Sequence, residues 1–152
     1  MARVADVGER DGWRCWLCDE AVDPTMSVND ARGPSVDSGP AAAKGAKDTK
    51  KGSDAGQERL AHRACNTRKG AVAPVVPWPD DLFVVDPAPI IAGVDQLQRK
   101  GGRVVMGRCP TSEDGQQAAD WLRDRISRLR PGLEINAVVQ PGGGQYLLVL
   151  RA

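Results

Sequence analysis

Aromatic residues and histidine are scarce in this chain of 152 residues, which has four Trp, one Tyr, one Phe and a single histidine, His62. The apolar fraction of 41% allows a modest core, enough for one or two small domains. Because there is only one histidine, no second imidazole is available for acid–base chemistry if His62 is engaged elsewhere.

Long apolar runs are also missing. The N-terminal residues MARVADVGERDGW contain no apolar stretch and predict no signal peptide, and no segment has the apolar length of a membrane span. We therefore expect no membrane partner and a cytoplasmic protein. The many Gly and Pro residues favour a bacterial or phage-infected cell. Four cysteines in such a chain favour metal binding or free thiols over disulfides.

The net charge is only +1, but the charge is unevenly distributed. Residues 1–40 carry a net −4, residues 41–70 a net +5, and residues 71–152 carry nine charges of each sign. The positive charge is thus concentrated around His62.

Two pairs of metal-ligating residues share one spacing. They are Cys15-x-x-Cys18 and His62-x-x-Cys65. One tight turn at each pair can present two ligands, and zinc takes four N or S ligands at tetrahedral corners. The pattern predicts a closed, structural Cys3His zinc site. The alternative is a redox C-x-x-C beside an unrelated histidine, although the β-α-β pattern of such a site is absent. Cys109 stands apart and is expected to be a free, partly buried thiol.

The second half of the chain predicts a small α+β unit. Apolar Ala118, Leu122, Ile126 and Leu129 form one helical stripe, and Thr111 or Ser112 is suited to cap that helix. The other expected elements are strands over 81–86 and 103–108, a helix over 90–99, and a hairpin of LEINAVVQ and QYLLVLR joined by PGGG.

The expected fold class is therefore α+β, with a zinc-stapled module over 1–71, a proline-rich connector over 72–82 and a β-α-β-β unit over 83–152. A short helix is predicted over 63–69, ended by Gly70. The stretch from Gly39 to Gly56 has almost no large apolar residues and is expected to be a loop. The β-α-β-β core is thin, so we expect this C-terminal unit to form a homodimer or to act as a docking module.

Three stretches together resemble the zinc-containing HNH endonuclease family. They are RDGWRCWLC (10–18), SVD (35–37) and RLAHRACNTRKGA (59–71). The resemblance covers roughly residues 8–71 and implies a ββα-metal fold with a structural zinc and one catalytic divalent ion. It implies that Asp37 binds this ion and that Asn66 on the helix completes its site, as suits a hard cation such as Mg²⁺.

The position of the family's general base departs from the pattern. Ser38 stands where the family has a histidine, and a hydroxyl cannot accept a proton as imidazole does. The family's loop asparagine corresponds to Gln57. Asp48, Asp54 or Glu58 could act as a substitute base, but no pattern places one there. Asp37 and Ser38 also suit an ordinary turn, and Asn66 a solvated helix position.

Basic residues surround the resemblance and predict phosphate contacts. The expected nucleic-acid-binding residues are Lys44, Lys47, Lys50, Lys51, Arg63, Arg68 and Lys69, and Arg59 lies among them. The alternative is that these charges are only solvated.

The sequence therefore predicts a degenerate HNH-like zinc protein that binds nucleic acid, DNA more than RNA, or a protein partner, with weak or no cleavage. One alternative is an active divalent-metal endonuclease with an unusual base. The other is a purely structural zinc-stabilised interaction protein.

Overall fold

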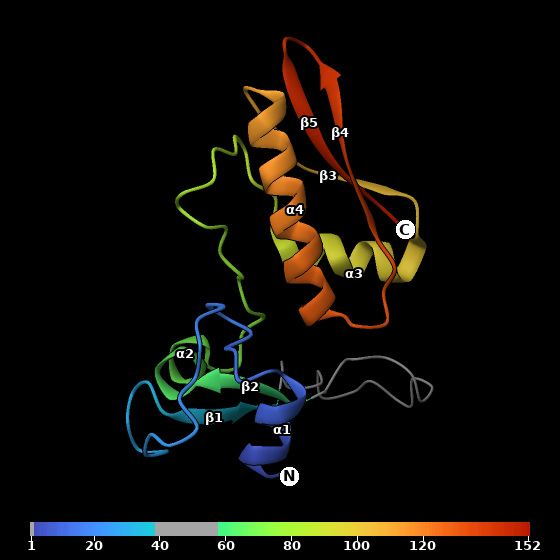
Figure 1. The fold of residues 1–152 in the computed structure, drawn as a ribbon. Helices are drawn as coiled ribbons and strands as arrows, with labels where there is room; N and C mark the ends of the chain where they lie inside the picture. Colours follow the sequence, from blue (N-terminus) through green and yellow to red (C-terminus); the bar gives the residue numbers. More distant parts are fainter. Residues whose placement is uncertain (1, 39–57) are drawn as a thin grey trace. The chain divides into compact units, whose positions relative to one another are not determined.

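The computed structural model describes residues 2–38 and 58–152. The chain divides into two compact units, Met1–Pro74 and Val75–Ala152 (Figure 1). Each unit has its own helices and its own antiparallel sheet, which confirms the α+β fold class. The boundary between the units falls inside the proline-rich stretch 72–82.

The first unit is a helix followed by a ββα arrangement. Helix α1 (Val4–Arg10) precedes a two-stranded sheet of β1 (Pro34–Asp37) and β2 (Arg59–His62), and α2 (Arg63–Lys69) follows directly (Figure 1). Pro34 pairs with His62 and Asp37 with Arg59. All four residues of β2 are buried, so this strand is the centre of the unit.

Local chemistry accounts for the ends of these elements. Helix α2 has the predicted bounds, because Gly70 takes a φ of 60°, which glycine adopts readily, and donates its N–H to Asn66 O. Helix α1 was not predicted. It ends where Trp13 packs over Gly8, and a Cβ at Gly8 would lie 2.7 Å from the Trp13 ring.

The second unit is a three-stranded sheet with two helices. Its elements in chain order are α3 (Ile90–Lys100), β3 (Arg103–Cys109), α4 (Ser112–Leu129), β4 (Asn136–Gly142) and β5 (Gln145–Arg151). The strand order is β3-β5-β4, fully antiparallel, and α4 packs on β4 and β5 (Figure 1). The predicted β-α-β-β order is confirmed.

The helix and hairpin predictions for this unit also hold. The Thr111 hydroxyl accepts a hydrogen bond of 3.1 Å from Asp114 N–H and caps α4. The apolar stripe of α4 is fully buried with Leu148 and Leu150 of β5. Gly143 and Gly144 have positive φ angles in the hairpin turn.

One strand prediction is wrong in extent. In the segment 81–86 only Val85 pairs with a strand, through an isolated bridge to Arg108 in β3. The stretch that precedes it belongs to the second unit: the Trp78 indole donates to Ala88 O and packs against Trp121 with ring centroids 5.5 Å apart. The prolines at 77, 79, 87 and 89 flank the segment, and because proline has no N–H to donate, a ladder does not extend through them.

Candidate metal centre

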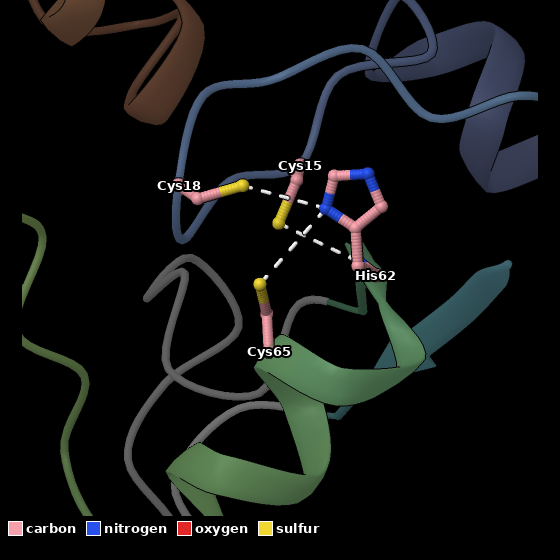
Figure 2. A group of neighbouring side chains, drawn as sticks. All are labelled: Cys15, Cys18, His62 and Cys65. Carbon is pink, nitrogen blue, oxygen red and sulfur yellow. Dashed lines mark hydrogen bonds between the residues drawn. The ribbon is translucent and has the colours of Figure 1, made fainter. Parts of the chain in front are cut away.

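The predicted ligands Cys15, Cys18, His62 and Cys65 lie together in the first unit, although they come from distant parts of the chain (Figure 2). Cys15 and Cys18 form a turn closed by a 2.8 Å hydrogen bond from Asp19 N–H to Cys15 O. His62 ends β2, and Cys65 is in the first turn of α2. A 3.0 Å hydrogen bond from Trp16 N–H to Leu60 O holds the cysteine turn against β2.

The geometry of the four side chains suits a tetrahedral ion. All ligand atoms lie within 4.8 Å of one another. His62 Nδ1 is 3.4 Å from Cys18 Sγ and 3.9 Å from Cys65 Sγ. These distances are close to the separation of about 3.5 to 3.8 Å between two such ligand atoms in a tetrahedral zinc site.

The second ring nitrogen of His62, Nε2, faces a backbone carbonyl and orients the ring so that Nδ1 points to the sulfurs. His62 Nε2 lies 3.1 Å from Ala21 O, and when Nε2–H donates to this carbonyl the Nδ1 lone pair faces the sulfurs (Figure 2). The backbone N–H of His62 donates to Cys15 Sγ at 3.4 Å. The group could thus hold a metal ion such as zinc, with every ligand supplied by protein and no open position for catalysis.

Electrostatics favour a cation between the three sulfurs. Burial raises the pKa of the Cys65 thiol to about 12, and the charges of Cys15 and Cys18 add to the rise. Burial likewise raises the pKa of Cys18. Three neighbouring thiolates repel one another, and a bound dication removes this penalty. Cys109 is fully buried in the other unit, and burial raises the pKa of this thiol above its ordinary value, as suits an inert side chain.

Asp37, the expected ligand of a catalytic ion, lies at the end of β1 in a buried ion pair. Its Oδ1 accepts from Lys69 Nζ at 3.1 Å, and its Oδ2 accepts from the Trp16 indole at 3.0 Å. The side chains of Asp37 and Lys69 are each 4% exposed. The carboxylate is therefore oriented by two donors from other elements.

Asn66 and Ser38 are the other two residues of the expected catalytic site. The Asn66 amide donates to Ser35 Oγ at 2.9 Å and to Val36 O at 3.2 Å, so it joins α2 to β1. Ser38 follows β1 and is exposed. Glu58, one candidate for a substitute base, accepts the Ala2 N–H at 2.8 Å.

The predicted phosphate-binding residues separate into three groups. Lys44, Lys47, Lys50 and Lys51 lie outside the described residues, as do Asp48, Asp54 and Gln57. Arg63 and Arg68 are exposed on α2. Lys69 is buried against Asp37, and Arg59 is paired at 3.1 Å with Asp11, so neither is exposed as phosphate contacts require.

Two residues that support the centre were not predicted as such. The buried indole N–H of Trp16, a residue of the cysteine turn, donates to Asp37. A buried indole usually requires an acceptor, which was the available signal. Asp11 accepts the Leu60 N–H at 2.7 Å and the Arg59 guanidinium, and it connects the end of α1 to β2.

Comparison with known proteins adds no family assignment. No protein-family model, curated protein or solved structure matches this chain. Among the described residues, no helix combines the length and the apolar character needed to cross a membrane.

Proposed function

We propose that residues 1–74 form a degenerate HNH-type zinc module that binds nucleic acid and cleaves it weakly or not at all. The observation that carries this proposal is the burial of Asp37 between Lys69 and Trp16, within a ββα arrangement that also contains a Cys3His cluster.

The order of the elements supports kinship with the HNH family. Strands β1 and β2 and helix α2 follow one another as a ββα unit, as the resemblance implies. Asp37 ends β1, and Asn66 on α2 contacts the same strand. The Cys3His cluster lies beside this unit and would hold the structural zinc, which supplies folding energy by clipping the cysteine turn to α2.

The same geometry argues against efficient cleavage. To bind a catalytic ion, Asp37 would have to leave Lys69, and breaking a buried ion pair typically costs about 3–5 kcal/mol. Ser38 cannot serve as a general base, whose loss lowers a rate about 10²–10⁴-fold. The absence of a histidine base and the pairing of Asp37 with Lys69 therefore both lower the expected rate of cleavage.

Nucleic-acid binding is supported by charge. Residues 41–70 carry a net +5, and Arg63 and Arg68 present two of these charges at the surface of α2. Arg63 also donates to Asn29 O at 2.9 Å, which holds its side chain toward the loop before β1. Contacts of this kind bind phosphates without reading bases.

A salt titration tests the binding. We expect the full chain to bind a labelled duplex DNA, and a matched RNA less well, with an affinity that falls steeply as salt rises. The double variant Arg63→Gln/Arg68→Gln should reduce the slope of log K against log salt by about two, because two phosphate contacts are lost. Arg3→Gln/Arg32→Gln removes the same charge from exposed positions of the same unit and should leave the slope unchanged. If the wild type and both double variants bind DNA with equal affinity, the zinc-stabilised interaction protein would be the better description.

Incubation with plasmid DNA tests the loss of cleavage. With Mg²⁺ or Mn²⁺ we expect no nicking above that of a heat-treated control. Rapid nicking that disappears in Asp37→Ala would establish the active endonuclease instead.

A further inference from the structure

The metal centre consists of two halves that the chain must bring together. The cysteine turn carries Cys15 and Cys18, and the β2–α2 junction carries His62 and Cys65, and His62 comes 44 positions after Cys18 in the chain. The backbones of the two halves are joined by a hydrogen bond from Trp16 N–H to Leu60 O, among other contacts. Metal affinity depends on how well these halves are preorganised, because residues that become ordered only when the metal binds lower the affinity.

One buried carboxylate contacts both halves at once. Trp16 stands between the two cysteines of the turn, and its indole donates to Asp37 Oδ2. Lys69 stands four residues after Cys65, on the same face of α2, and donates to Asp37 Oδ1. Asp37 itself belongs to neither half, since it ends β1.

We propose that Asp37 is a positioning residue of the metal centre: it holds the cysteine turn through Trp16 and helix α2 through Lys69, and so sets the spacing of the four ligands. The inference depends on the metal binding proposed for this unit and is independent of nucleic-acid binding. Asp37 then acts on the Cys3His site and is not a ligand of any second ion.

The charges of the pair explain why both partners are needed. Hydrogen bonds between an ammonium and a carboxylate are among the stronger ones in proteins, and both side chains here are 4% exposed. Asp37→Asn would leave the Lys69 ammonium buried without its counterion. Lys69→Met would leave the carboxylate buried with its indole donor but without the ammonium. Either change therefore loosens α2, which carries Cys65.

Zinc affinity measured against a chromophoric chelator tests this role. We expect Asp37→Asn and Lys69→Met each to weaken zinc binding, on the order of 10-fold or more. The double variant should lose less than the product of the two single losses, because the two residues act as one pair. Trp16→Phe should also weaken binding. Asp6→Asn, an exposed carboxylate on α1, is the matched control and should bind zinc as the wild type does.

Cobalt substitution separates positioning from ligation and from general destabilisation. The Co²⁺ absorption bands of every variant should keep the wild-type positions, because Asp37 is not a ligand. Val7→Ala, which removes buried apolar atoms from α1, calibrates the loss of zinc affinity that follows from lower stability alone. At equal unfolding stability, Asp37→Asn should lose more zinc affinity than Val7→Ala.

Three results would overturn the proposal. They are unchanged zinc affinity in Asp37→Asn, fully multiplicative losses in the double variant, and Mn²⁺ binding by the wild type that Asp37→Asn abolishes. The last of these would place Asp37 in a second ion site. Absence of DNA binding would refute the proposed function and leave these zinc measurements unaffected.

Discussion

The ammonium of Lys69 lies 3.1 Å from Oδ1 of Asp37, and both side chains are buried. From the sequence, these residues were expected to act separately, Asp37 on a divalent ion and Lys69 on a phosphate. A carboxylate and an ammonium that neutralise each other in the interior are poorly placed for either task. Their pairing favours a role for Asp37 in supporting the Cys3His cluster over a role in binding a catalytic ion.

The first prediction concerns metal content. The purified protein should contain one zinc per chain, and Cys65→Ser or His62→Ala should bind zinc far more weakly, because each removes one of four ligands. Cys109→Ser is the matched cysteine control and should retain the full content, since Cys109 lies in the second unit. Elemental analysis and the Co²⁺ spectrum provide the measurement. Loss of zinc in Cys109→Ser alone would contradict the ligand assignment.

A second prediction concerns metal removal. A strong chelator should unfold the first unit and leave the second folded, because the second has its own core of Leu122, Ile126, Leu148 and Leu150. Hydrogen exchange should show amide protection lost in β2 and α2 and retained in β5. Equal retention of protection in both units would mean that the metal contributes little to folding.

A third prediction concerns acid stability and Asp11. Burial alone raises the pKa of Asp11, but hydrogen bonds from Arg10 and from Leu60 N–H, with the charge of Arg59, outweigh it and lower this pKa below the ordinary 3.8. A lowered folded pKa stabilises the fold above the unfolded pKa and ceases to do so as the pH falls through the folded value.

Asp11→Asn should therefore reduce the free energy of unfolding by about 1–3 kcal/mol at neutral pH. The difference from the wild type should persist down to about pH 4 and shrink at lower pH. Urea titrations of both proteins at a series of pH values measure it. A difference that grows on acidification would contradict the sign of the effect.

A fourth prediction concerns Gly33, which precedes β1. A Cβ at this position would lie 1.9 Å from the backbone oxygen of Ser27, and Gly33 O accepts the Arg63 N–H at 2.9 Å. Gly33→Ala must displace backbone and should destabilise the first unit by about 1–3 kcal/mol. Gly132→Ala meets no atom within 4 Å and should change stability little. Thermal unfolding of the two variants makes the comparison, and equal midpoints would be the contrary result.

Much of the local structure was predictable because neighbouring residues determine it. The apolar stripe and Thr111 cap predicted α4, and Gly70 marked the end of α2. The strand predicted over 81–86 was wrong in extent, because a run of four apolar residues, 82–85, suggested a ladder, whereas only Val85 pairs, through an isolated bridge to Arg108. Helix α1 was missed because its burial depends on Trp13, which packs back over Gly8.

The sequence by itself indicated the four members of the Cys3His cluster, because each x-x spacing is a local property that one turn or one helical turn satisfies. Only the tertiary structure decided the partners of Asp37, since Trp16 and Lys69 are 21 and 32 residues away and meet it only when β1, the cysteine turn and α2 pack together. Residue type showed which side chains can bind an ion or a phosphate. Burial against a particular neighbour decided that Asp37 and Lys69 bind each other.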